Sequence, residues 1–182
     1  MMKKLIIPAF LLLIAAQIYV PASMIIDREK VISKGKVYLF ETAPIDPRDP
    51  FRGQYVQLDF KEDSYIPSDI GLFSQGQEIY VHIQKDEADI AKIVKISKEQ
   101  PTSNDYLKAS IYYISNERVY INYPFERFYM EETKAPQAEK TLRQTSADDQ
   151  RKAYAKIYVL QGESVLTDVL VDGKSLREIN RE

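Results

Sequence analysis

The fold class is decided by residues 153–171, AYAKIYVLQGESVLTDVLV, in which two runs of apolar residues flank Gln161-Gly162. Apolar side chains in these runs recur mostly at every second position, which is the period of a strand with one buried face. A glycine between two such runs permits the positive φ of a tight hairpin turn. The stretch therefore predicts an antiparallel hairpin with strands at Ala153–Leu160 and Ser164–Val171.

Runs with the same period, bounded by Gly, Pro, Asn or Asp, recur from Val31 onward. The other predicted strands are Lys36–Glu41, Tyr55–Lys61, Glu78–Lys85, Ile90–Lys98, Tyr106–Ile114, Arg118–Tyr123 and Arg127–Glu131. Asp86-Glu87 and Ser115-Asn116 are hairpin-like turns between them. Short strands without a repeated strand–helix alternation favour an antiparallel sandwich or barrel over a parallel sheet. We expect a mainly β, β-rich α+β fold.

Residues 135–152 differ in composition, because Ala, Gln, Glu, Lys, Leu and Arg predominate and these are strong helix formers. Ala138, Leu142 and Ala147 form a thin apolar stripe at helical spacing. The segment therefore predicts one short exposed helix or a mobile flap.

Aromatic residues are abundant, with 13 Tyr and 7 Phe but no Trp. The tyrosines of the predicted strands are Tyr80, Tyr112, Tyr113, Tyr120, Tyr123, Tyr154 and Tyr158. On a half-buried sheet, a tyrosine places its ring in the core and its hydroxyl at the edge. The alternative interpretation is a platform of exposed strand tyrosines that binds carbohydrate or peptide.

Charge and cysteine content exclude several classes of protein. The chain has 25 basic and 27 acidic residues and a net charge of −2, far from the basic balance of a nucleic-acid binder. It contains no cysteine, which excludes disulfides, thiol catalysis, Cys-ligated zinc and iron–sulfur clusters. His82 is the only histidine, so we interpret it as a satisfied or solvent-facing strand residue. We expect neither a metal nor a cofactor.

Residues 5–26 carry no charge and are long enough to cross a bilayer as a helix. Lys3 and Lys4 precede this run, whereas the charges of residues 27–30 cancel, so the positive-inside bias places the N-terminus in the cytoplasm. We expect a membrane anchor at residues 1–26 and an extracytoplasmic, periplasmic domain at residues 27–182, held by a single pass in the inner membrane. The alternative is a cleaved signal peptide, because Val20-Pro21-Ala22 offers small residues at the cleavage positions.

The most unusual segment is residues 42–60, TAPIDPRDPFRGQYVQLDF, whose prolines at spacing three predict a stiff extended loop. Its charged residues before Gly53 are Asp46, Arg48, Asp49 and Arg52. A rigid loop would hold these groups for bidentate recognition of a carboxylate or another anionic partner. Alternatively, the four charges brace the loop through Asx-turns and ion pairs.

The end of this segment resembles the signature Gly-Asp-Tyr-x-x-Leu-x-Tyr of the GDYXXLXY family of bacterial membrane-anchored proteins. Gly53, Tyr55 and Leu58 match the signature, whereas Gln54 stands in place of its Asp and Phe60 in place of its last Tyr. Other residues that fit the family pattern are Pro44, Asp46, Pro47, Arg48, Asp49, Arg52 and Val56. Residues 123–132 with a later Glu139, and residues 168–173, are similar to further blocks of the family.

The resemblance implies a protein without an established activity, often encoded beside multi-pass membrane proteins. Gln54 can form hydrogen bonds but cannot act as a general base at neutral pH, so no catalytic role passes to it.

The three residues that match the signature can also be interpreted as determinants of the fold. Gly53 would permit the backbone turn, the Tyr55 hydroxyl would form a hydrogen bond to the loop, and Leu58 would fill the core. On a strand, Tyr55, Gln57 and Asp59 share one face. Their neighbours on the opposite face, which we expect to be the core, are Val56, Leu58 and Phe60.

We expect a non-enzymatic accessory or partner-binding subunit of a membrane assembly, with a multi-pass membrane protein as its partner. The predicted binding residues are Asp46, Arg48, Asp49, Arg52, Tyr55, Phe125, Tyr129 and Glu131.

Two alternatives stay open. Ser23-Met24 directly after the apolar run is similar to the nucleophile segment of type I signal peptidases, which are Ser-Lys hydrolases, although Ile25-Ile26 follow where that family has Pro-Thr. The second alternative is an envelope module that binds glycan or peptide.

Overall fold

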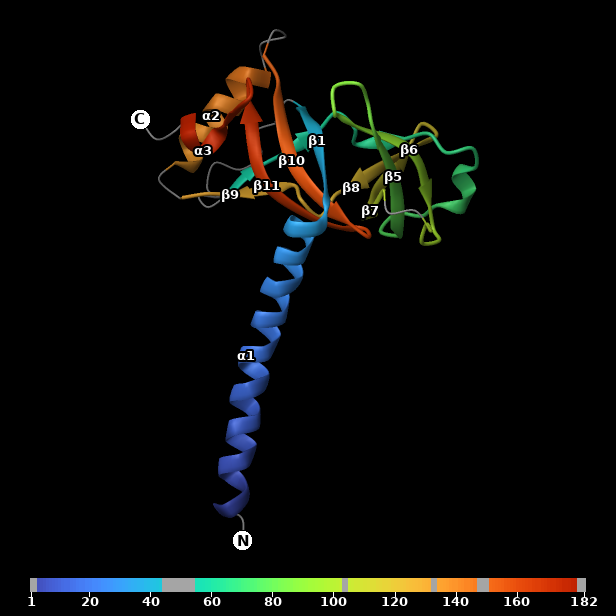
Figure 1. Cartoon of the computed structure of the whole chain (residues 1–182). Coiled ribbons are helices and arrows are strands. Elements are labelled where there is room, and N and C mark those ends of the chain that lie inside the picture. The colour runs from blue at the N-terminus through green and yellow to red at the C-terminus, as the bar shows by residue number, and fades with distance from the viewer. Residues whose placement is uncertain (1–2, 44–54, 103–104, 132–133, 147–150, 180–182) are drawn as a thin grey trace.

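The strands form two five-stranded antiparallel sheets and a two-stranded ribbon, from which one long helix extends (Figure 1). The computed structural model describes residues 3–43, 55–102, 105–131, 134–146 and 151–179. The mainly β fold predicted from the alternating sequence pattern is confirmed.

The first sheet has the order β12-β11-β10-β1-β3. Its strands are β1 (Lys36–Ala43), β3 (Asp59–Phe60), β10 (Ala153–Leu160), β11 (Glu163–Val171) and β12 (Lys174–Ser175). The predicted hairpin is β10–β11, and its turn residues Gln161 and Gly162 have φ values of 52° and 87°. Helices α2 (Ala135–Ser146) and α3 (Leu176–Ile179) and the ribbon of β2 (Tyr55–Gln57) and β9 (Arg127–Tyr129) lie on the side of this sheet that faces away from the second sheet (Figure 1).

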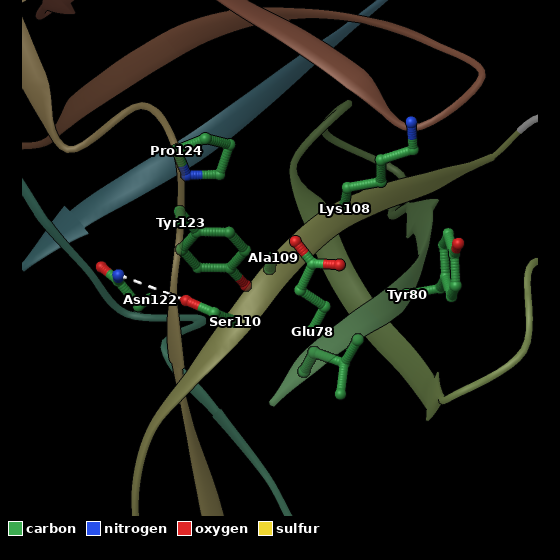
Figure 2. Close-up of a pocket in the computed structure, with 9 residues that line it drawn as sticks. Glu78, Tyr80, Lys108, Ala109, Ser110, Asn122, Tyr123 and Pro124 are labelled. Atoms are coloured by element: carbon green, nitrogen blue, oxygen red, sulfur yellow. Dashed lines mark hydrogen bonds between the residues drawn. The ribbon is translucent and has the colours of Figure 1, made fainter. Parts of the chain in front are cut away.

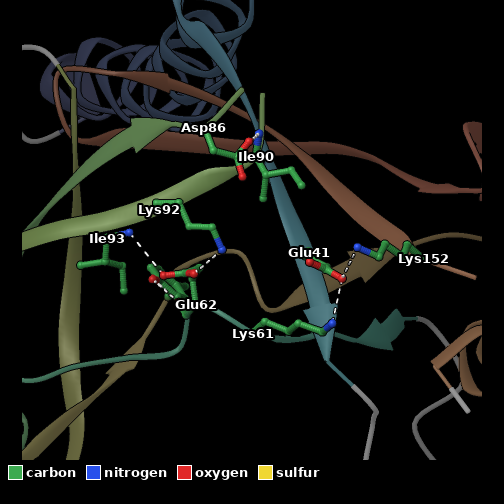
Figure 3. A network of polar contacts seen from close by, with 9 residues as sticks. Glu41, Lys61, Glu62, Asp86, Ile90, Lys92, Ile93 and Lys152 are labelled. Carbon is green, nitrogen blue, oxygen red and sulfur yellow. Dashed lines mark hydrogen bonds and ion pairs between the residues drawn. The ribbon is translucent and has the colours of Figure 1, made fainter. Parts of the chain in front are cut away.

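The second sheet has the order β4-β8-β7-β5-β6 and curls into a nearly closed barrel. Its strands are β4 (Ser64–Tyr65), β5 (Glu78–Lys85), β6 (Ala91–Ser97), β7 (Tyr106–Ser115) and β8 (Arg118–Asn122). Glu62, just before β4, closes the barrel against β6, because its carboxylate lies 2.6 Å from Lys92 Nζ and accepts from Ile93 N at 3.4 Å (Figure 3). Tyr65 adds a hydrogen bond to Val94 O at 2.9 Å. Alternate residues of the strands, such as Val81, Leu107 and Val119, fill the interior.

A second polar group joins β1 to the residues that follow β3 and precede β10. Glu41 on β1, largely buried, lies 2.8 Å from Lys61 Nζ and 3.7 Å from Lys152 Nζ (Figure 3). Lys61 follows β3 and Lys152 precedes β10, so this carboxylate joins three segments that are distant in sequence.

Helix α1 (Lys3–Lys34) is longer than the apolar run and continues into the domain (Figure 1). Near its end, Val31 is buried and the Arg28 guanidinium donates to Ser164 O at 3.2 Å. Gly35 then leads directly into β1, and its N–H donates to Val31 O at 2.8 Å. The last turns of the helix therefore pack on the β10–β11 hairpin, without a linker between helix and sheet. One helix of the described chain, Phe10–Lys34, is long and apolar enough to cross a membrane.

Two predicted elements and the predicted burial of two tyrosines differ from the structure. The single strand predicted at Tyr55–Lys61 is two strands, because β2 pairs with β9 whereas β3 pairs with β1. The helix predicted at residues 135–152 ends at Ser146, and residues 147–150 lie outside the described part. Tyr112 and Tyr113 are exposed rather than half-buried, unlike Tyr80, Tyr154 and Tyr158. The sequence pattern also missed the short elements β4, β12, α3 and the 3-10 turn Ile70–Leu72.

Candidate functional site

The signature segment divides its side chains between the two faces as predicted. Val56, Leu58 and Phe60 are buried in the core, while Tyr55 and Gln57 are half-buried and Asp59 is exposed on the other face. The backbone of the signature is also fixed, because Leu58 N donates to Glu126 O at 2.8 Å. This face assignment is therefore confirmed.

The two segments that resemble the family pattern meet in the β2–β9 ribbon. Tyr55 pairs with Tyr129, and Gln57 pairs with Arg127. The rings of Tyr55 and Tyr129 have centroids 5.6 Å apart, and the Arg127 guanidinium lies 5.1 Å from the centre of the Tyr55 ring. Tyr129 is 60% exposed, so two phenols and a cation form an accessible surface. We call Tyr55, Gln57, Arg127 and Tyr129 the β2–β9 surface.

A carboxyl group borders this surface. Glu126 is half-buried, and its carboxylate accepts from Gln57 Nε2 at 3.5 Å. Burial raises the pKa of Glu126, and the negative charge of Asp59 acts in the same direction, while the hydrogen bond from Gln57 and the charge of Arg127 oppose the shift. Carboxyls with a raised pKa at a surface of mixed charge are candidates for ligand or partner contacts.

The raised pKa of Glu126 gives a pH dependence with a defined sign. The folded state binds a proton at this carboxyl more tightly than the unfolded chain does, so stability falls as the pH rises from the ordinary glutamate pKa through the raised one. In Glu126→Gln, this contribution is absent. We expect the melting temperature of Glu126→Gln minus that of the wild type to increase across this pH window and then level off. Melts at a series of pH values test this, and a constant difference would contradict the raised pKa.

The other predicted binding residues lie in different environments. Phe125 is buried, with its ring centroid 5.3 Å from that of Phe40, so its ring is part of the core rather than of the surface. Glu131 is exposed and forms an ion pair with Lys134 at 2.8 Å. The predicted residues outside the described part of the chain are Asp46, Arg48, Asp49, Arg52 and Gly53.

Gln57, Glu126, Arg127 and Arg177 were not among the predicted site residues. The Arg177 guanidinium, on α3, lies 4.9 Å from the centre of the Phe128 ring and 3.5 Å from Tyr129 O, so it covers the back of β9. The period of the signature strand places Gln57 on the outer face beside Tyr55. Arg127 lies in the block 123–132 that resembles the family, but the sequence did not indicate that it or Arg177 lies beside Tyr55 or Tyr129, because their positions depend on the pairing of β2 with β9 and on a short helix.

The residues weighed for catalysis have ordinary local partners. His82 Nε2 lies 3.1 Å from Ser97 Oγ on the neighbouring strand, which confirms a satisfied strand histidine. Ser23 lies in α1, where its hydroxyl donates to Val20 O at 2.8 Å. Within the described ranges, no three His, Cys, Asp or Glu residues are grouped so that they could hold a metal ion.

Comparison with known proteins identifies one family. The model of the GDYXXLXY protein family matches residues 17–169, from the second half of the apolar run to β11. No curated protein and no solved structure matches the chain. Because the match includes both strands of the β2–β9 ribbon and most of the chain, the protein belongs to the GDYXXLXY family.

Proposed function

We propose that this protein is a non-enzymatic accessory subunit of a membrane assembly and that its β2–β9 surface contacts a multi-pass membrane protein. Residues 1–26 anchor it in the inner membrane with the N-terminus in the cytoplasm, and residues 27–182 form the extracytoplasmic domain. The observation that carries the proposal is the accessible β2–β9 surface, in which Tyr129 is 60% exposed, in a chain whose N-terminal helix is long and apolar enough to cross a bilayer.

The attachment of α1 supports a subunit that works close to the bilayer. A cut after Ala22 would divide a helix that runs on to Lys34 and packs through Val31 on the domain. With the helix intact, the domain has a fixed orientation relative to the bilayer, since no linker separates Lys34 from β1. A preorganised subunit loses little orientational freedom when it binds a neighbour in the same membrane.

The chemistry of the β2–β9 surface supports a protein partner. Tyr and Arg are enriched at the energetic centres of interfaces, because each combines a large contact area with hydrogen-bonding groups. The charged segment at residues 44–54 directly precedes β2 in the sequence, so Arg48 and Arg52 are expected to contribute to the same contact.

A native pull-down of the tagged full-length chain from its own membranes, with quantitative mass spectrometry, tests the proposal. We expect a multi-pass membrane protein in roughly stoichiometric amount. Tyr129→Ala, and separately Arg48→Ala with Arg52→Ala, should reduce its recovery by about tenfold or more, the effect of losing an interface hot spot. Tyr129→Ala should melt as the wild type does, because Tyr129 is 60% exposed.

Tyr112→Ala is the matched control, because Tyr112 is 61% exposed but lies on the barrel. It should leave partner recovery unchanged. Recovery of the protein alone, or equal loss of the partner in the Tyr112 and Tyr129 variants, would refute a contact through the β2–β9 surface.

A further inference from the structure

The outer face of the barrel carries a cleft that the proposed partner contact does not use. Its volume is about 300 Å³, and it lies over β5, β7 and β8, with Pro124 at one side (Figure 2). The polar side chains that line it are Glu78, Tyr80, Lys108, Ser110 and Asn122. A cleft of this size fits a small ligand or one unit of a polymer.

Three of these polar groups form one row across three strands. In the sheet register, Asn122 of β8 pairs with Ser110 of β7, and Ser110 pairs with Glu78 of β5. Asn122 Nδ2 donates to Ser110 Oγ at 3.3 Å (Figure 2). Within the described ranges, the Glu78 carboxylate has neither a hydrogen bond nor an ion pair. The row thus offers amide, hydroxyl and carboxylate groups at the spacing of adjacent strands, about 5 Å.

The charge of the cleft selects against anions. Lys108 is the cation of its lining, and its ammonium group lies 2.8 Å from the Glu163 carboxylate at the tip of the β10–β11 hairpin. Because Glu163 neutralises Lys108, Glu78 is the charge of the lining that is left without an ion pair among the described residues, and the cleft together with Glu163 has a net charge of −1. A phosphate or carboxylate ligand would be repelled, whereas neutral hydroxyl groups could donate to Glu78.

Exposed tyrosines form the next row on the same face. Tyr112 follows Ser110 by two residues on β7, and Tyr120 precedes Asn122 by two residues on β8, so the tyrosines and the polar row point outward together. Tyr113 stacks on Tyr120 with centroids 4.2 Å apart, and Tyr112 meets Tyr113 edge-on at 5.2 Å. The bulge between Ile111 and Tyr113 places Tyr112 and Tyr113 on the surface, where Tyr112 is 61% and Tyr113 39% exposed.

We propose that this face of the barrel binds a neutral oligosaccharide. One sugar occupies the cleft and donates its hydroxyls to Glu78, while Ser110 and Asn122 bond to neighbouring hydroxyls. The next sugar lays the C–H face of its ring on Tyr112. Aromatic rings beside a row of amide, hydroxyl and carboxylate groups match a pyranose, which has an apolar ring face and a polar edge. The proposal goes beyond the partner contact and does not depend on it.

The test is a calorimetric titration of the full-length chain in lipid nanodiscs. Chitotetraose, cellotetraose and xylotetraose are added in separate experiments. Sugar-based detergents are avoided because their headgroups would compete. We expect at least one of the three to bind. Glu78→Gln should weaken it by about tenfold, since a hydrogen bond to a charged acceptor is roughly twice as strong as a neutral one. Tyr112→Ala should weaken it by roughly fivefold to tenfold through loss of the aromatic face.

Tyr129→Ala is the control, because it removes an equally exposed tyrosine from the β2–β9 surface. It should bind the oligosaccharide as the wild type does. Three results would overturn the proposal: no binding of any neutral tetrasaccharide, equal affinity in all variants, or preference for tetragalacturonate or tetralysine. The pull-down and this titration use opposite control variants, so the failure of one proposal is distinguishable from the failure of the other.

Discussion

Phe40→Ala is expected to lower the free energy of unfolding by about 3–5 kcal/mol, the usual cost of removing a fully buried phenylalanine ring. Phe40 is 0% exposed, and its ring centroid lies 5.8 Å from Phe60, 5.6 Å from Tyr123 and 5.3 Å from Phe125. These rings come from β1, β3 and the connection from β8 to β9, so the cluster joins the first sheet to the barrel. The variant removes the centre of that junction.

Thermal unfolding followed by circular dichroism measures the effect. A loss of 1 kcal/mol lowers the melting temperature by roughly 2–4 °C in a chain of this size, so a decrease of about 6–20 °C is expected. Phe40→Leu should retain most of the stability, because it keeps apolar volume in the cluster. Tyr112→Ala, at the surface, should change the free energy of unfolding by no more than about 0.5 kcal/mol. If the melting temperature of Phe40→Ala were the same as that of Tyr112→Ala, the aromatic cluster would not be part of the stabilising core.

Tyr123 shows why this junction is specific as well as apolar. Its ring stacks on Phe125 with centroids 5.0 Å apart, and its hydroxyl donates to Glu62 O at 2.6 Å. Burial raises the pKa of this phenol, so it stays protonated and keeps its bond to the backbone that precedes β4. The side chain of Glu62 holds β6 through Lys92, while its backbone oxygen accepts from Tyr123. Glu62 therefore links the aromatic cluster to the place where the barrel closes.

Elements whose sequence pattern is local could be predicted from the sequence. Strands β5 and β10 begin and end where their alternating patterns do, because each has one continuous buried face. The division of the signature between β2 and β3 could not be predicted, because it depends on which strands pair with each half. Strand pairing is a long-range property that side-chain period does not encode.

In the candidate site too, the local pattern could be predicted from the sequence and the long-range neighbours could not. The alternation of the signature strand correctly placed Leu58 in the core and Tyr55 on the outer face. The neighbours of Tyr55 required the three-dimensional structure, because Arg127 and Tyr129 are far along the chain and reach it only through the ribbon. The cleft on the barrel was equally hidden, since Glu78 and Asn122 are ordinary exposed residues in their own strands.

Gly35→Ala is the second variant with a large expected effect, about 2–4 kcal/mol of lost stability. A Cβ at this position would clash with Val31 O and lie 2.9 Å from Val159 O, and both atoms belong to the backbone. Relief requires α1 to move away from β10 or to lose the hydrogen bond from Gly35 N to Val31 O. Overpacking costs about 1–3 kcal/mol, and a lost hydrogen bond adds about 0.5–1.5 kcal/mol.

Limited trypsin digestion, run beside the thermal melt, distinguishes undocking of the helix from unfolding of the domain. Arg28, Lys30 and Lys34 lie at the docked end of α1. Undocking should accelerate cleavage there while the strands stay protected, because proteolysis follows local opening. Gly173→Ala is the matched control: its φ is +81° and nothing lies within 4 Å of the added Cβ, so only backbone strain of about 1–2 kcal/mol is expected. Unchanged stability and cleavage in Gly35→Ala would mean that α1 is not held against β10. The β-rich part would then turn freely on α1, which would contradict the fixed orientation that the proposed accessory role requires.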